Sequence, residues 1–156
     1  KGEHGAPGEL KGDFDFARDS GTLYANTESG IFGKLSAQDA AVLGGKAYSI
    51  AARDEVKTGS ATILATVNGN ETKEYAIEIE KVYPASGASR NLLLRVTDEA
   101  LLEKTGGVVQ GMSGSAILQN GKLIGAVTHV LLDDSSRGYG IFIENMLDAA
   151  GLSYEA

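Results

Sequence analysis

The stretch SAILQNGKLIGAVTHV, residues 115–130, predicts a β-hairpin. Its two halves, residues 115–119 and 123–130, are rich in apolar and β-branched residues, as strands are. Asn120-Gly121 between them is a hairpin-turn signal, because both residues tolerate the positive φ that a two-residue turn requires. The stretch therefore indicates antiparallel β structure, and the flanking sequence extends it.

Four more strand candidates surround this hairpin, so that six strands occupy residues 60–143. Over residues 75–82, Tyr75, Ile77 and Ile79 fall on one face and Glu78 and Glu80 on the other, which predicts a strand with one buried face. Short strands joined by tight turns favour a β-sandwich or a closed barrel. A short helix over residues 144–150 follows, with Gly151 as its C-cap. The other three predicted strands are residues 61–67, 92–96 and 139–143.

The pattern is weaker in the first third of the chain. Residues 1–29 read as a loop, and residues 37–43 as a helical turn or merely an apolar stretch. Residues 31–35 and 46–52 are strand candidates. We therefore predict a boundary near residues 57–59.

Composition excludes several classes of function. The chain has 156 residues, enough to bury a core, and no Cys, which excludes disulfides and thiolate metal sites. The chain has only two His, which argues against a multi-histidine metal site, and we expect neither metal nor cofactor. A net charge of −7 argues against nucleic acid as a partner. The sequence starts with neither an initiator Met nor a signal peptide, so we expect a fragment of a longer protein.

The connection between the third and fourth strands carries the pattern Gly111-Met112-Ser113-Gly114-Ser115. Nucleophilic catalysis by serine needs an exposed hydroxyl and two convergent backbone N–H groups that bind the oxyanion. Glycine neighbours give the backbone the freedom to aim those groups. Ser113 is therefore the candidate nucleophile, with the N–H groups of Gly111 and Ser113 as the oxyanion hole. The alternative is an ordinary turn.

The order of elements around this loop resembles the second barrel of the trypsin-like double-barrel peptidases. In these enzymes the nucleophile lies between the third and fourth strands, and a hairpin, a sixth strand and a helix follow. The resemblance implies that Thr128 lies beside the catalytic residues, and that His129 and Val130 offer backbone groups to an extended peptide. The implied fold is an all-β, trypsin-like double β-barrel. Residues 1–58 would be the remnant of an incomplete N-terminal barrel with the interdomain segment, and residues 59–156 the C-terminal barrel plus helix.

Five motifs narrow this resemblance to one family, from about residue 30 to the end of the chain. They are similar to the signature of the stage IV sporulation protein B peptidases. The motifs are TGGVVQGMSGS at 105–115, NGKLIGAVTHV at 120–130, GYG at 138–140, GIFG at 30–33 and RVTD at 95–98.

The family resemblance implies a serine endopeptidase of endospore-forming bacteria. Such enzymes are secreted across the forespore membrane into the intermembrane space. There they cleave a membrane-bound regulator of an intramembrane protease, and so trigger activation of a late sporulation sigma factor. The implied partner is this protein substrate, without nucleic acid or metal. The resemblance also implies a membrane anchor and a PDZ domain, which are expected outside residues 1–156.

The sequence departs from the family pattern at two places. Ala116 stands where the family has Pro, a change that we expect to be tolerated. The family's catalytic His belongs to a Gly-His motif, which Glu3-His4-Gly5 does not match. We therefore expect the chain to start after the base and to lack peptidase activity alone. The N-terminal barrel is then either truncated or completed by a separate N-terminal fragment after self-cleavage.

Asp98 lies fifteen residues before Ser113 and corresponds to the acid proposed for the family's catalytic triad. The alternative is that Asp98 is the N-cap of a short helix over residues 99–104, a position that Asp favours. In that case another acid takes the triad role: Asp13, Asp15, Asp19 or a residue upstream of residue 1.

His129 is the other histidine besides His4, and it neighbours the expected substrate strand. Side chains alternate along a strand, so Thr128 and His129 are expected to point in opposite directions. A binding or structural role for His129 is therefore favoured over a role as the base. The polar loop over residues 133–137 either borders the specificity pocket or is a solvated turn.

Three other functions stay open at this point. The chain could be a pseudoenzyme whose barrel binds peptides, or a secreted β-sandwich without activity. It could also be a self-processed product whose active form needs a second chain.

Overall fold

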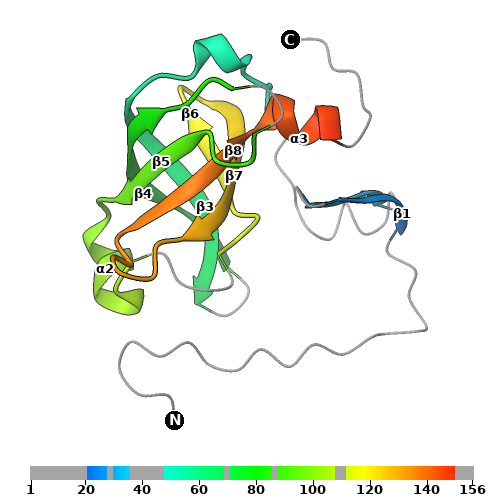
Figure 1. Cartoon of the computed structure of the whole chain (residues 1–156). Coiled ribbons are helices and arrows are strands. Elements are labelled where there is room, and N and C mark those ends of the chain that lie inside the picture. Colours follow the sequence, from blue (N-terminus) through cyan, green and yellow to red (C-terminus); the bar gives the residue numbers. More distant parts are fainter. Residues whose placement is uncertain are drawn as a thin grey trace, which may run out of the picture.

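The computed structural model of the chain describes residues 21–27, 30–35, 48–68, 71–85, 88–107 and 112–149. Its centre is a closed antiparallel barrel in the order β3-β4-β5-β8-β7-β6 (Figure 1). All six predicted strands are confirmed. Of the two predicted architectures, β-sandwich and closed barrel, the structure shows the barrel. The strands are β3 Gly59–Asn68, β4 Glu71–Val82, β5 Leu92–Val96, β6 Ala116–Gln119, β7 Lys122–Val130 and β8 Arg137–Phe142.

Two short α-helices lie at opposite ends of the barrel (Figure 1). Helix α2, Glu99–Thr105, follows β5, and helix α3, Ile143–Ala149, follows β8 directly. The fold is thus all-β with a short C-terminal helix, as predicted, and it is consistent with a trypsin-like peptidase. The predicted division of the chain at residues 58 and 59 stays a prediction. No helix within the described ranges is long and apolar enough to span a bilayer.

The barrel interior is filled by alternate side chains of the strands. In β4, Tyr75, Ile77 and Ile79 are buried, whereas Ala76 between them is exposed and Glu78 is half-buried, as the period of two predicts. Each fully buried aliphatic side chain contributes about 1.5–3 kcal/mol. Burial of these side chains therefore stabilises the closed barrel.

The barrel closes between β3 and β6 through a short seam of two residue pairs, Thr62↔Leu118 and Ile63↔Ile117. The buried amide of Gln119 reinforces this seam. It accepts from the N–H of Lys57 at 3.0 Å and donates to the carbonyl oxygen of the same residue at 2.9 Å. The hairpin turn that follows has φ of 52° at Asn120 and 74° at Gly121, which confirms the predicted turn.

Two predictions for the first third of the chain are wrong. Residues 21–29 were expected in a loop, yet β1 (Gly21–Thr27) pairs antiparallel with β2 (Gly30–Leu35). The partner strand supplies the hydrogen bonds that make an unpatterned segment extended. Residues 46–52 were expected as a strand, yet the described part of this segment makes one isolated parallel bridge, Ile50↔Leu123.

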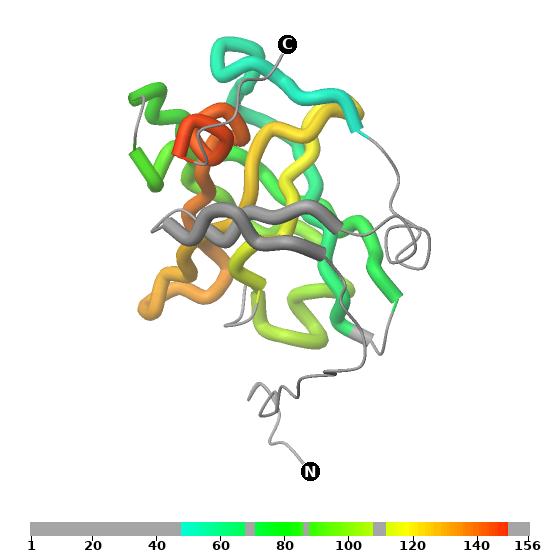
Figure 2. The backbone as a smooth tube through the Cα atoms, turned by 90° about the vertical axis from the view of Figure 1, so that its right-hand side faces the viewer, coloured from blue at the N-terminus to red at the C-terminus, as the bar shows by residue number. Residues whose placement is uncertain are grey.

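The segment before β3 is attached to the end of the barrel where the β6–β7 turn lies (Figure 2). Ala51 donates to the Leu123 carbonyl at 3.0 Å. A 3-10 helix, η1, follows at Arg53–Glu55, and Arg53 forms an ion pair with Glu144 of α3 at 2.9 Å. These contacts hold the segment and α3 together.

Candidate active site

The turn that carries Ser113 is fixed to β7 by backbone hydrogen bonds. Gly114 donates to the Val127 carbonyl at 2.7 Å, and Val127 donates to the Ser115 carbonyl at 2.9 Å. Met112 is buried and anchors the start of the turn. Gly114 has φ of 91°, a conformation that side chains disfavour, so glycine is required there. This framework holds Ser113 at the exposed tip of the turn.

Ser113 and Thr128 are brought together, as the resemblance predicted. The exposed Ser113 hydroxyl donates to the Thr128 carbonyl oxygen at 3.2 Å. Among the described residues, the Ser113 N–H has no partner, so this N–H is available to an oxyanion. The second predicted oxyanion donor, Gly111, lies outside the described residues.

The predicted opposite orientation of Thr128 and His129 is wrong. His129 Nδ1 lies 2.9 Å from Thr128 Oγ1, within hydrogen-bond distance. The cause is a β-bulge between Val127 and His129, which sets two residues of β7 against Gly140 and disturbs the alternation. The ring of His129 is thus bound to Thr128, and no hydrogen bond joins it to Ser113 among the described residues. His4 lies outside them.

Within the described part of the chain, one edge of β7 is open beside Ser113. The pairing of β7 with β6 ends at Ala116↔Ala126, and within the described ranges no further strand continues along this edge. The Leu131 N–H donates to β8, so strand alternation turns the backbone groups of Val130 toward the open edge. The Thr128 carbonyl faces Ser113 at the same edge. An extended peptide therefore finds backbone partners at Thr128 and Val130, while the His129 backbone pairs with β8.

Asp98 is the N-cap of α2, which confirms the helix-capping alternative. Its Oδ1 accepts from the Leu101 N–H at 3.1 Å, and its Oδ2 accepts from the Ala76 N–H at 3.2 Å. Both carboxylate oxygens thus bind backbone donors, and in the described structure neither bonds to Ser113 or His129. The triad role of Asp98 stays a prediction. The alternative acids Asp13, Asp15 and Asp19 lie outside the described residues.

The predicted polar loop between β7 and β8 packs on the end of α2. The Ser135 hydroxyl donates to the Gly106 carbonyl at 2.8 Å. At Gly107 a Cβ would lie 2.1 Å from the Ser135 carbonyl oxygen, so only glycine permits this approach. A hydrogen bond from the Ser136 hydroxyl lowers the pKa of the Asp134 carboxyl. The loop is therefore fixed against the start of the connection that leads to the Ser113 turn.

Two buried asparagines, which the sequence analysis did not single out, hold the loop between β4 and β5. The Asn91 amide nitrogen donates to the carbonyls of Tyr83 and Ala85, at 3.1 and 3.0 Å. Its oxygen accepts from the Phe142 N–H at 3.2 Å and from the Asn145 amide at 3.0 Å. An asparagine at the start of an apolar strand was the available signal, because a buried amide needs several partners.

This loop reaches the candidate site through Ser89, whose carbonyl lies 3.3 Å from Thr128 Oγ1. The same hydroxyl lies 3.3 Å from the Tyr139 carbonyl. The hydrogen of Thr128 goes to one of these carbonyls, so its oxygen is left to accept from His129 Nδ1. We assign the Nδ1–H form to His129 on this basis.

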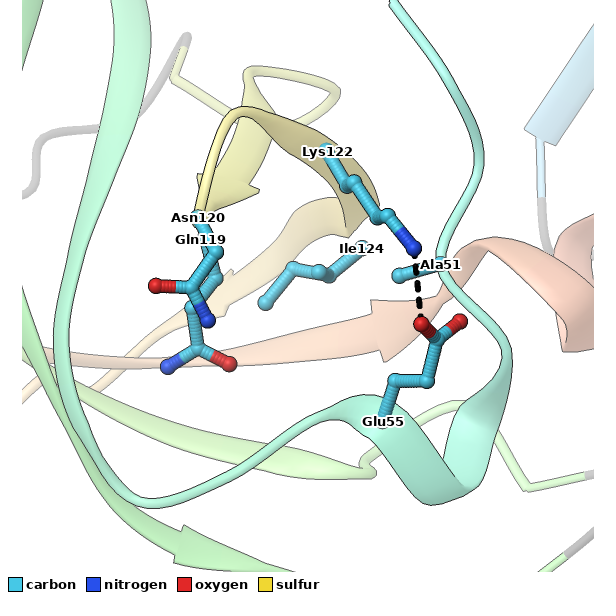
Figure 3. A pocket seen from close by; sticks show the side chains of 6 residues that line it. All are labelled: Ala51, Glu55, Gln119, Asn120, Lys122 and Ile124. Carbon is cyan, nitrogen blue, oxygen red and sulfur yellow. Dashed lines mark hydrogen bonds and ion pairs between the residues drawn. The ribbon is translucent and has the colours of Figure 1, made fainter.

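A pocket of about 260 Å³ lies near the opposite end of β7 (Figure 3). Lys122 Nζ and Glu55 Oε1 are 2.7 Å apart there, and this hydrogen bond lowers the pKa of Glu55. Strand spacing puts Lys122 roughly 20 Å from Thr128, so the pocket is separate from the Ser113 site. Within the described residues no group of His, Asp and Glu could hold a metal ion. The pocket is lined by Ala51, Glu55, Gln119, Asn120, Lys122 and Ile124.

Comparison with known families gives one match over almost the whole chain. The family described as SpoIVB peptidase S55 matches residues 1–147. The match begins well before residue 30, where the motif resemblance was predicted to start. A comparison with curated proteins finds no match.

Proposed function

The chain belongs to the SpoIVB peptidase S55 family of sporulation serine peptidases, and we propose that it cleaves peptide bonds through an acyl-enzyme on Ser113. The observation that carries this proposal is the exposed Ser113 hydroxyl on a turn that is hydrogen-bonded to β7 beside the open edge of this strand. An extended substrate can pair with this edge, and the turn places the nucleophile at the end of the paired stretch.

In the proposed reaction, Ser113 Oγ attacks the carbonyl carbon of the scissile peptide bond. The hydroxyl proton passes to a general base, and the carbonyl oxygen becomes an oxyanion bound by the Ser113 N–H and the predicted N–H of Gly111. The C–N bond then breaks, and the base returns the proton to the leaving amine. Water hydrolyses the acyl-enzyme by the same steps and restores the Ser113 hydroxyl.

The base is proposed to lie outside the described residues. The Ser113 hydroxyl donates to the Thr128 carbonyl, and the only described histidine, His129, binds Thr128 Oγ1 through Nδ1. A serine hydroxyl is a weak nucleophile unless a base accepts its proton. A separate N-terminal fragment of the same protein is one proposed source of this base. Substrate binding would displace the Ser113 hydrogen bond, since a substrate N–H competes for the same carbonyl.

The biological substrate is proposed from the family resemblance. It is the membrane-bound regulator of an intramembrane protease, whose cleavage would trigger late sigma-factor activation. This proposal places the protein in the forespore intermembrane space, where the substrate's extracytoplasmic part is accessible. The alternative is a barrel that binds peptides at the β7 edge without cleaving them, which the bond from Ser113 to Thr128 in place of a base supports.

Peptide hydrolysis by the full-length protein distinguishes these functions. We expect Ser113→Ala to abolish the catalysis that needs the nucleophile. The remaining hydrolysis should be only about 10³–10⁴-fold faster than the uncatalysed reaction in water. The matched control is Ser115→Ala, in the same turn, which should keep the wild-type rate. Near-wild-type hydrolysis by Ser113→Ala would contradict the assignment. A wild-type protein that binds peptides without hydrolysing them would support the alternative.

A further inference from the structure

We propose that Arg90, stacked over the Tyr139 ring, binds an acidic side chain of the substrate. The position concerned is the second or fourth residue before the scissile bond. This assignment rests on the proposed function, because it takes the substrate strand to pair with the open edge of β7.

Arg90 is an exposed cation without a carboxylate partner in the described structure. The other three described arginines each form ion pairs, although the chain as a whole has a net charge of −7. The guanidinium carbon of Arg90 lies 5.3 Å from the centroid of the Tyr139 ring. Stacking on a ring face orients a guanidinium while its edge N–H groups stay free to bind an anion.

The position of Arg90 connects it to the candidate site. The preceding residue, Ser89, approaches Thr128, whose hydroxyl lies 3.3 Å from the Ser89 carbonyl. Tyr139, which carries the stacked guanidinium, is the register partner of His129 across β7 and β8. Register partners share one face of a sheet, so Arg90, Tyr139 and His129 form one surface. β7 lies between Tyr139 and the edge that a substrate would use, and His129 on β7 is the member of this surface next to that edge.

Strand geometry decides which substrate residues face this surface. Val130 packs its side chain against the core, whereas the His129 side chain is exposed. A substrate residue opposite Val130 shares the core-facing side, and its neighbours in the substrate point to the side of His129. Ser113 lies at the Thr128 carbonyl, so the residue bound there is the one whose peptide bond is cut. The residue at Val130 is then the third before the cut, and the second and fourth face His129 and Arg90.

The chemistry of this surface favours a carboxylate. A guanidinium binds a carboxylate through two parallel, charge-assisted hydrogen bonds, which neutral side chains cannot match. Because the site is exposed to solvent, the expected preference is moderate and should weaken as salt is added.

Binding of matched peptides tests the assignment. The full chain carrying Ser113→Ala, which cannot form an acyl-enzyme, is titrated with fluorescent peptides that differ only by Glu or Gln at the second or fourth position. We expect the Glu peptide to bind about three- to tenfold more tightly at one of these positions. Arg90→Gln should remove the preference by weakening binding of the Glu peptide, and Arg90→Lys should keep part of the preference. Lys104→Gln, the loss of another exposed cation, is the matched control and should keep the full preference.

The outcomes separate the two proposals. If none of the peptides binds, the proposal that the open edge of β7 binds substrate is contradicted, and the role of Arg90, which depends on it, falls as well. Binding without a Glu preference, or a preference that survives in Arg90→Gln, would overturn the role of Arg90 alone.

Discussion

Substitution of Asp98 measures the two roles considered for this residue. The structure shows its carboxylate accepting from the N–H groups of Leu101 and Ala76, at 3.1 and 3.2 Å. Asp98→Ala removes an N-cap, which costs about 1 kcal/mol, and a second hydrogen bond of about 1 kcal/mol. The expected loss of unfolding free energy is therefore about 2 kcal/mol. Asp98→Asn should lose about 1 kcal/mol, because asparagine caps a helix as well as aspartate does but offers one acceptor oxygen instead of two.

Urea unfolding of the two variants gives these free energies, with Glu99→Gln in the first turn of α2 as a control that should stay within about 0.5 kcal/mol of wild type. An Asp98→Ala variant as stable as wild type would refute the capping geometry. Peptide hydrolysis by Asp98→Asn then tests catalysis separately, since this variant keeps most of the stability. A fall in kcat of about 10⁴-fold would assign Asp98 to the triad as well, whereas an unchanged kcat would assign it to capping alone.

Two further predictions concern the framework around the site. Gly140→Ala should lower the unfolding free energy by about 1–3 kcal/mol, because the new Cβ would lie 2.7 Å from Cδ1 of Ile117. Adding Ile117→Val removes that atom, so the double variant should lose less stability than the sum of the two single losses. A loss equal to that sum in urea unfolding would contradict the contact. Ser136→Ala should raise the pKa of Asp134 toward its ordinary value, since it removes the largest cause of the lowered pKa. A lowered carboxyl pKa stabilises the fold at neutral pH, and this contribution is lost as the pH falls through the pKa of the folded state. NMR titration measures the Asp134 pKa, and an unchanged value in Ser136→Ala would refute the hydrogen bond as the cause.

The strands of the barrel could be predicted because their signals are local. Alternation in β4 and the Asn120-Gly121 turn each depend on a few neighbouring residues, and both are present in the structure. The helix cap at Asp98 was also within reach, since the preference of aspartate for that position is local.

The features that were missed depend on partners distant in the sequence. The bulge after Val127 brings Thr128 and His129 together, and no residue type in that stretch announces it. Asn91 binds groups more than 50 residues away, including Asn145, so its importance becomes visible only in the folded chain. The site surface beside Ser113 is built largely from such long-range contacts.

Covalent labelling of the full-length protein with a fluorophosphonate probe tests the central claim most directly, because the probe reacts with serines activated for nucleophilic attack. We predict one adduct, which mass spectrometry places on Ser113, with labelling lost in Ser113→Ala and retained in Ser115→Ala. An adduct on another residue, or labelling that persists in Ser113→Ala, would contradict Ser113 as the nucleophile.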